Sequence, residues 1–402
     1  MGRMASDFTF NPFDEATRRD PFAVYARGRE LRAYRHPGLP VVSIFRHADT
    51  IEVLRDWRAF SNVFPLPTGV KPSEDLPPNM LGTDPPEHER LRGLVNQAFT
   101  PKIIRRLEPR MEEIAESLLD DALAKRNVDL VQALTYPLPV TVIAEIIGVP
   151  PEDGARFKHW SDELVSTLGS GLLAPPSPEQ MEHTLSIVRE LGAYFSGLVE
   201  ERRREPREDL LSGLVAAELE GTHLSFDELL QMLILLLVAG NETTTTLIGN
   251  TALTLLAHPE ELARVRADLE LVPSAIEEVL RFSSPVQMDP RCATADTELC
   301  GEKVAKGEIV ITWLGAANRD EAVFKEPERF DVARRENRHL AFGFGTHYCL
   351  GSNLARLEAQ TALRTLLRRT RDFRLATSEP LPLHRSIVFR SFTKIPVELD
   401  PA

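Results

Sequence analysis

The sequence predicts a mainly α-helical protein with a smaller β-rich part. Apolar residues recur at helical spacing over most of the chain, whereas strand-like runs are few and short. One predicted helix, from Ser225 to about residue 258, is much longer than the rest, about 50 Å at about 1.5 Å per residue. With 402 residues, 43% of them hydrophobic, the chain is long enough for a large core.

The elements follow in order along the chain. Helical patterns before the long helix cover residues 21–33, 49–60, 100–124, 138–147, 151–168 and 179–204. Strands are predicted at residues 40–45, 290–294, 387–389 and 395–399. Two loops stand out, a proline-rich stretch over 61–86 and a Gly/Pro-rich break over 169–178. A loop as long as the first is usually functional or disordered, and we favour a functional one.

Composition excludes several classes of protein. The net charge of −13 argues against a general nucleic-acid binder. Three cysteines in a chain of this size do not form a disulfide framework. Residues 1–20 are polar and hold no apolar segment long enough for a signal or a membrane anchor. We therefore expect a soluble, cytoplasmic protein with no membrane anchor and no nucleic-acid partner.

The long helix begins with a capping box, Ser225 and Glu228. Residues 232–239 are apolar on every face, which indicates burial on all sides. A membrane span is the competing interpretation, but polar residues from Gly240 onward end the apolar run at eight residues. Glu242 and Thr243 are poor choices for a buried helix, because an unpaired buried carboxylate is costly and threonine is a weak helix former. Together they indicate a site.

Cys349 lies in a loop, 342–351, that holds three glycines. Glycine reaches backbone conformations that other residues avoid and lets a ligand come close. A helical pattern starts near Leu350, so Cys349 is predicted to lie at a helix N-terminus, where a thiolate is favoured. For a lone cysteine a buried structural role is the usual alternative, but such a role needs no glycines.

The pattern Phe342-x-x-Gly345-x-x-x-Cys349-x-Gly351 resembles the haem-ligand loop of the cytochrome P-450 superfamily. The resemblance covers nearly the whole chain and implies a single catalytic domain over residues 1–402. It implies the cytochrome P-450 fold, with haem b (heme b, iron protoporphyrin IX) between the long helix and the cysteine loop with its following helix. Phe342 and Gly351 would line the cofactor, and Cys349 would be its proximal metal ligand, a thiolate that favours O–O cleavage.

The same resemblance assigns roles to the polar block in the long helix. Ala239 and Gly240 match the oxygen-activation groove of the family and would lie against the cofactor. Glu242 and Thr243 match its acid followed by an alcohol, and they would deliver protons.

Four basic residues are candidates for binding the haem propionates. His88 and Arg92 are four apart, so they share one helical face and could grip one anionic group. A solvated basic face is the ordinary alternative. The resemblance favours the ligand role, and it adds Arg291 and His347 as further propionate ligands.

A Glu-x-x-Arg pair, Glu278 and Arg281, matches the buried scaffold network of the family. The segment 327–331 matches the family's Pro-x-x-Phe-Asp, which makes Arg329 the expected third member. Cys292 and Cys300 are interpreted as buried strand residues. One departure is Ser391, since the family commonly has glycine after the basic residue of this turn.

The implied function is that of a haem-thiolate monooxygenase that inserts one oxygen atom of O2 into a lipophilic small molecule. No flavin or iron–sulfur segment follows Ala402, so we expect a monomer that receives electrons from a separate ferredoxin and ferredoxin reductase. Two alternatives remain. A peroxide-driven peroxygenase would lack the acid–alcohol pair, and a haem-based gas sensor would lose the pair or gain an output domain.

Two sets of residues complete the predictions. The substrate pocket is expected to be apolar and to involve Leu235, Val238, Ala239, Val286, Met288, Val388 and Phe389, with Gln287 and Asp289 nearby. A basic patch for an acidic electron donor is expected at Arg105, Arg106, Arg334, Arg335, Arg338, Arg364 and Arg368.

Overall fold

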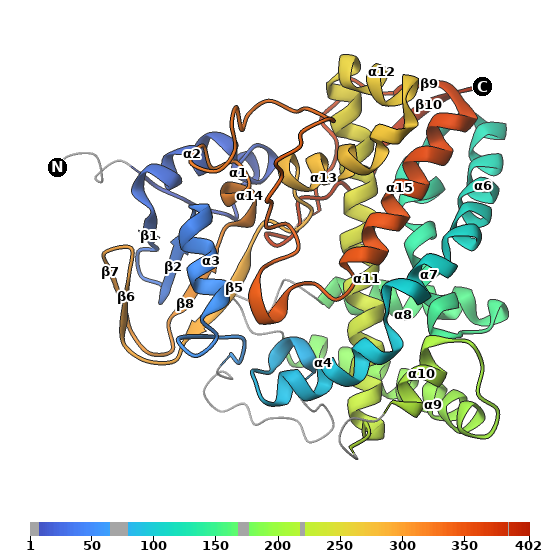
Figure 1. The fold of residues 1–402 in the computed structure, drawn as a ribbon, viewed down its shortest axis with the longest axis horizontal. Coiled ribbons are helices and arrows are strands. Elements are labelled where there is room, and N and C mark those ends of the chain that lie inside the picture. Colours follow the sequence, from blue (N-terminus) through green and yellow to red (C-terminus); the bar gives the residue numbers. More distant parts are fainter. Residues whose placement is uncertain (1–7, 65–78, 168–176, 218–221, 385) are drawn as a thin grey trace.

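Most of the helices form one side of the molecule, and a small sheet forms the other together with α1 (Glu15–Arg19), α2 (Phe22–Leu31), α3 (His47–Arg55) and α14 (Leu314–Ala317) (Figure 1). The computed structural model describes residues 8–64, 79–167, 177–217, 222–384 and 386–402. The predicted architecture, mainly helical with a smaller β-rich part, is confirmed. Most of the proline-rich loop (65–78) and most of the Gly/Pro-rich break (168–176) lie outside the described residues.

The helices have the following bounds: α1 Glu15–Arg19, α2 Phe22–Leu31, α3 His47–Arg55, α4 Glu87–Ala98, α5 Pro101–Arg106, α6 Glu108–Lys125, α7 Pro137–Ile147, α8 Gly154–Thr167, α9 Pro178–Arg204, α10 Leu210–Ala216, α11 Phe226–Ala257, α12 Pro259–Ala267, α13 Val272–Phe282, α14 Leu314–Ala317 and α15 Ser352–Arg369. Short turns of other helix types are η1 Met80–Gly82, η2 Val131–Thr135, η3 Pro151–Asp153, η4 Leu269–Leu271 and η5 Gly345–His347.

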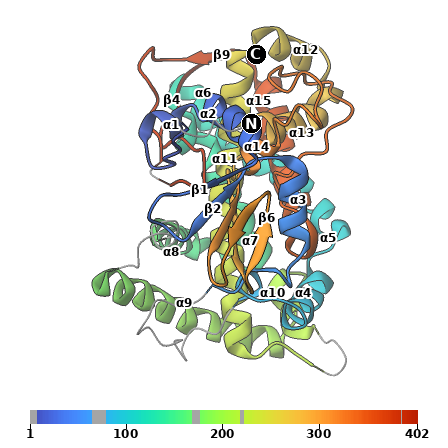
Figure 2. The same cartoon turned by 90° about the vertical axis from the view of Figure 1, so that its left-hand side faces the viewer.

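The strands are β1 Ala33–Arg35, β2 Val41–Ile44, β3 Phe60–Ser61, β4 Asn127–Asp129, β5 Asp289–Ala293, β6 Thr297–Leu299, β7 Glu302–Val304, β8 Ile309–Thr312, β9 Thr370–Leu375 and β10 Pro396–Pro401. Five of them form a sheet in the order β1-β2-β8-β5-β3, in which β2 and β8 are parallel and the other pairs antiparallel. This sheet lies in front of the helical side in Figure 2. Strands β4, β10 and β9 form a second sheet.

The long helix α11 is the central element of the helical side. Its predicted capping box is present: the Ser225 hydroxyl accepts the Glu228 N–H at 3.2 Å, and the Glu228 carboxylate accepts the Ser225 N–H at 2.8 Å. The helix packs against α7, α8, α13 and α15. Within the described chain it is the one helix long and apolar enough to cross a membrane, but 56% of its most apolar window is buried by neighbouring elements. Core packing therefore accounts for much of its composition, but the predicted burial of residues 232–239 on all sides was wrong: Leu235 and Val238 are only partly buried and Ala239 is exposed.

Three local predictions were wrong. Residues 387–389 form no strand, because only Phe389 pairs, in an isolated bridge with Val286. Helix α3 ends at Arg55 instead of near residue 60, where the short strand β3 begins. Cys300 is not a strand residue: it lies in the turn between β6 and β7 with φ 55°. Cys292, in β5, is buried as expected.

The third member of the scaffold network is Arg334, and the prediction of Arg329 was wrong. Glu278 and Arg281 are both 0% exposed and paired at 2.7 Å. The Arg334 Nε donates to both Glu278 carboxylate oxygens at 3.0 Å. The turn at 326–331 leaves the Arg329 side chain 59% exposed and sends only its carbonyl oxygen to the network. Because its side chain is only 12% exposed, Arg334 also drops out of the predicted basic docking patch.

Candidate active site

The cysteine loop is shaped by two of its glycines. Gly343 and Gly345 have φ of 72° and 73°, in the left-handed region that favours glycine. A Cβ on Gly345 would also lie 2.8 Å from the Leu54 carbonyl oxygen. Gly351 differs, since its φ is −80° and a Cβ there would meet no atom within 4 Å. The side of the loop near Gly351 is thus open.

Cys349 is held between this loop and helix α15. Its N–H donates to the Phe342 carbonyl at 2.9 Å, which closes the loop. Helix α15 begins at Ser352, two residues later than its pattern suggested, so Cys349 precedes the N-cap residue Gly351 by two positions and does not itself lie at the helix N-terminus. Burial raises the pKa of the Cys349 thiol, while the Gly351 N–H and the guanidinium of Arg92 act in the opposite direction.

Arg92, on α4, fixes the cysteine loop from the side. Its guanidinium donates to the Tyr348 carbonyl at 2.6 Å and to the Thr346 carbonyl at 3.4 Å. The same helix carries His88 one turn earlier, as the spacing predicted. Helix α4 and the cysteine loop are therefore joined directly next to Cys349.

Two buried histidines meet beside this contact. The rings of His88 and His347 lie 4.2 Å apart between centroids. Neither ring nitrogen of His88, which is 1% exposed, has a hydrogen-bond partner among the described residues, and the His347 Nε2 has none either. The nearest carboxylate oxygen to that Nε2, from Asp84, is 4.0 Å away. Buried polar atoms without partners are rare in proteins, so these imidazoles are placed to meet a further polar group.

The electrostatics of the pair favour an anion. Burial lowers the pKa of His88 to about 4, with a further decrease from Arg92. Burial likewise lowers the pKa of His347 to about 3, with further decreases from His88, Arg291 and Arg92. Positive charges thus converge on the unpartnered nitrogens, and an anionic group there would satisfy both the hydrogen bonds and the charge.

Arg291 reaches the same place from strand β5. Its side chain is 2% exposed, and it is paired with Asp289, whose Oδ2 lies 3.2 Å from Nη2. A further bond of 2.7 Å goes to the Pro290 carbonyl. Because Arg291 lowers the pKa of His347 through space, the structure brings together all four basic residues that the sequence singled out.

The polar block of α11 keeps its helical backbone. The Thr243 hydroxyl donates to the Ala239 carbonyl one turn earlier at 2.6 Å, a bond that competes with the helix ladder. Burial raises the pKa of Glu242, and the nearby His384 and the Ser391 hydroxyl oppose the shift. Ser391 donates to Glu242 Oε1 at 3.2 Å. A Cβ on Gly240 would lie 3.8 Å from Ile143, an ordinary contact.

Sequence reasoning missed one buried acid. Glu358, on α15, is 2% exposed, and burial raises its pKa well above the usual range, with the Thr244 hydroxyl opposing. Leu354 and Ala362, four residues before and after it, are buried as well. The sequence pattern that could have predicted it is an acidic residue at a position that shares a helix face with apolar residues.

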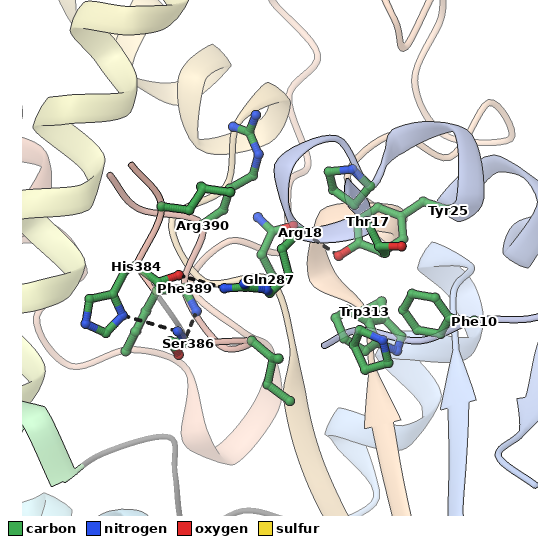
Figure 3. Close-up of a pocket in the computed structure, with 14 residues that line it drawn as sticks. Phe10, Thr17, Arg18, Tyr25, Gln287, Trp313, His384, Ser386, Phe389 and Arg390 are labelled. Atoms are coloured by element: carbon green, nitrogen blue, oxygen red, sulfur yellow. Dashed lines mark hydrogen bonds between the residues drawn. The ribbon is translucent and has the colours of Figure 1, made fainter. Parts of the chain in front are cut away.

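Met288, expected in the substrate pocket, and Gln287, expected near it, are both buried. Gln287 accepts a hydrogen bond from the Tyr25 hydroxyl at 3.1 Å and donates to the Ser284 carbonyl at 2.6 Å. It borders a cavity of about 20 Å³ beneath the N-terminal segment, with Trp313 on its far side (Figure 3). Met288 is 1% exposed and packs in the aromatic cluster of this segment. Both belong to the core beside the sheet.

Comparisons with known proteins agree with this arrangement. The family model described as Cytochrome P450 matches residues 34–393. Cytochrome P450 107B1 of Saccharopolyspora erythraea is 41% identical over 402 residues, with 96% of each chain covered. The solved structure of CYP109Q5 from Chondromyces apiculatus has a TM-score of 0.89 at 41% identity, with 98% of each chain covered.

A third comparison is the crystal structure of CYP109E1 from Bacillus megaterium in complex with testosterone. It has a TM-score of 0.85 at 36% identity and covers 94% of this chain and 99% of that one. The matches extend over the sheet, the long helix α11 and the cysteine loop together. The chain therefore belongs to the cytochrome P450 family of monooxygenases, which carry haem b.

Proposed function

We propose that Cys349 is the proximal iron ligand and that His88, Arg92, Arg291 and His347 bind the haem propionates. The observation that carries this proposal is the pair of buried imidazoles with unpartnered nitrogens beside Arg92 and Arg291. Two carboxylates at this place would satisfy those nitrogens and balance the charge. The open side of the loop at Gly351 leaves room for a flat group next to Cys349. The residues present thus fit the cofactor of the family.

Bound haem supplies the activation of O2 and the transfer of one of its atoms to the substrate. For each O2, the reaction takes two electrons and two protons, and the second oxygen atom leaves as water. We assign proton delivery to Glu242 and Thr243. Burial raises the pKa of the Glu242 carboxyl, so it keeps a proton to higher pH than a solvated carboxyl and can donate it. The Thr243 hydroxyl, held by the Ala239 carbonyl, can pass that proton toward the side of α11 where Gly240 offers only backbone.

We propose a lipophilic substrate whose ring or chain contacts the partly buried Leu235 and Val238 of α11. The testosterone complex of a relative of similar fold makes a steroid-sized molecule a reasonable first probe. The finer class, terpenoid, steroid, acyl chain or macrocycle, is to be found by screening for the substrate-induced shift of the haem absorption band.

We propose that the whole chain works as one catalytic domain, a cytoplasmic monomer reduced by a ferredoxin and its reductase. The burial of α11 in the helical core supports a protein that needs no membrane. The electron donor would dock on the basic patch without Arg334, at exposed residues such as Arg105, Arg335 and Arg368. At net charge −13, a local basic surface is needed to attract an acidic partner.

The cysteine assignment is tested by the absorption of the reduced, CO-bound protein. We expect the red-shifted band for which the family is named, because thiolate donation from Cys349 moves the haem transition. Cys349→His is expected to bind haem, to lose this band and to lose monooxygenation. Cys292→Ser, a change at another buried cysteine, serves as the control and is expected to keep the band. A histidine-type CO spectrum in freshly folded wild type would refute the assignment.

The proton-delivery assignment is tested by product formed per NAD(P)H consumed. Thr243→Ala is expected to keep haem and substrate binding while most electrons end in peroxide, because the hydroxyl that directs protons is gone. Glu242→Gln is expected to slow turnover about 100-fold, the lower range for loss of an acid–base group. Thr251→Val serves as the control, since Thr251 makes the same bond to a carbonyl one turn earlier, that of Leu247, two turns further along α11. Unchanged coupling and rate in both variants would remove the pair from the mechanism.

A further inference from the structure

A cavity lined by both polar and apolar side chains lies behind Glu242. Its volume is about 90 Å³. It lies between η2 with Tyr136, α11 and the C-terminal segment before β10. The residues that line it are Val131, Thr135, Tyr136, Glu242, Thr245, Thr246, Gly249, Asn250, His384, Ser391, Phe392, Thr393 and Ile395.

The lining is suited to water. A buried water needs about 10–15 Å³ of such space and two to four polar partners, so this cavity has room for several molecules. The Thr135 hydroxyl is 0% exposed and has no hydrogen-bond partner among the described residues, although it borders the cavity. A water molecule in the cavity would satisfy it. The hydroxyls of Tyr136 and Thr393 and the carboxylate of Glu242 supply further partners.

Two further residues that border the cavity are His384 and Ser391. His384 is partly exposed and borders the cavity, and its N–H donates to the Ser391 carbonyl at 3.0 Å, so the two are joined by their backbones. The Ser391 hydroxyl in turn donates to Glu242 Oε1 at 3.2 Å. The partly exposed imidazole and the Glu242 carboxyl thus border the same cavity, and Ser391 is bonded to both residues.

The charged neighbours of Glu242 come from two segments packed against α11, the C-terminal segment and α8. Burial raises its pKa, His384 lowers it, and Asp162 of α8 raises it. The Asp162 carboxylate accepts a hydrogen bond from the Tyr136 hydroxyl and thereby orients it. A carboxyl poised between these neighbours can exchange a proton with water in the cavity.

We propose that this cavity is a water-filled chamber through which protons from solvent reach Glu242, with His384 at its outer end and Ser391 as the residue that positions the carboxyl. The proposal rests on the proposed role of Glu242. Each turnover removes two protons through Glu242, and the chamber returns them from bulk water by transfer between hydrogen-bonded oxygens. The electrons come from the redox partner of the enzyme.

The test compares Ser391→Ala, His384→Gln and Thr135→Val with the wild-type holoenzyme. In all three variants, product formation is expected to fall roughly five- to tenfold, the effect of one lost hydrogen bond. Rates in D2O are expected to fall further in the variants than in wild type, because proton transfer becomes limiting. Reduction by the first electron and the substrate-induced spectral shift are expected to stay unchanged.

Infrared spectroscopy gives a readout independent of turnover. The carboxyl band of protonated Glu242 is assigned as the band lost in Glu242→Gln. In Ser391→Ala its titration midpoint is expected to move to higher pH, because a donor to the charged form is gone. Ser386→Ala is the matched control: this serine lies in the same segment and outside the chamber, and its backbone N–H, which bonds His384 at 3.3 Å, is retained. Ser386→Ala is expected to change neither the Glu242 carboxyl band nor the solvent isotope effect.

The outcomes separate the two proposals. If Glu242→Gln leaves turnover and coupling unchanged, the assigned role of Glu242 fails. If Glu242→Gln slows turnover but Ser391→Ala and His384→Gln change neither the isotope effect nor the carboxyl band, Glu242 keeps its role and the chamber proposal is overturned. Slower turnover with a larger isotope effect and a shifted band supports the chamber.

Discussion

Replacing Arg334 by alanine is expected to destabilise the protein far more than the same change at Arg329. The Arg334 guanidinium donates twice to Glu278, at 3.0 Å each, and also to the carbonyls of Lys325 at 2.8 Å and Arg329 at 2.9 Å. Alanine would remove the Arg334 donor from the Lys325 carbonyl and would leave the Arg329 carbonyl with Arg281 alone. It would also remove one of the two cations around a carboxylate that is 0% exposed.

The size of the expected loss depends on the hydrogen bonds that Glu278 keeps in Arg334→Ala. Glu278 keeps two bonds from Arg281, at 2.7 and 2.8 Å, and bonds of 3.1 Å from the Asn337 amide and the Asp331 N–H. Removing the only partner of a buried charge costs about 3–5 kcal/mol. Since Glu278 stays paired with one arginine, we expect about 3 kcal/mol in the free energy of unfolding, the lower end of that range.

Arg329→Ala is the matched control. Its side chain is 59% exposed, and its nearest carboxylate, that of Glu326, is 3.8 Å away and equally exposed. Such a change is expected to alter stability by at most about 0.5 kcal/mol. The assay is urea unfolding of the haem-loaded variants, followed by tryptophan fluorescence and by haem absorption. Equal losses for the two variants, or a larger loss for Arg329→Ala, would show that the network is not centred on Arg334.

Two further predictions concern pH and electron transfer. Burial alone would raise the pKa of Glu277, but hydrogen bonds from His339 and Arg356 outweigh it and lower the pKa to about 2, below the ordinary 4.5. The difference in unfolding free energy between wild type and Glu277→Gln is thus largest above pH 4.5 and disappears as the pH falls toward 2. A difference that stays constant between pH 4.5 and pH 2 would contradict the ion pair. Reversing the charge at Arg364 and Arg368 together is expected to slow the first electron transfer from a ferredoxin without changing the substrate-induced spectral shift. Wild-type reduction is expected to slow as salt rises, since the Debye length shrinks to about 8 Å at about 0.15 M; stopped-flow rates that respond to neither change would place the dock elsewhere.

Much of the architecture follows from local patterns in the chain. The start of α11 was predictable because a capping box sets it, whereas the burial on all sides that its apolar run suggested is only partly present. Gly345 predicted a turn in a backbone conformation that favours glycine, and its φ in the structure is 73°. The shared face of His88 and Arg92 follows from helix geometry alone. Such features depend on residues within a few positions of one another.

Contacts between distant segments were not predictable in the same way. Whether Arg329 or Arg334 reaches Glu278 depends on how one turn is folded over α13, and both have the same chemistry. The sequence does not show toward which side of its segment the Gln287 side chain points. In the structure it points toward Tyr25, whose hydroxyl donates a hydrogen bond to it.

The sequence by itself determined the family, the mainly helical fold, the cysteine loop and the acid–alcohol pair, because each is a short pattern of residue types at fixed spacing. Only the tertiary structure decided which groups surround those residues. Ser391 bonds Glu242 across 149 positions of sequence, and the unpartnered nitrogens of His88 and His347 come together from α4 and the cysteine loop. The physical reason is that burial, charge and hydrogen bonding depend on distances in space, which a local pattern does not contain.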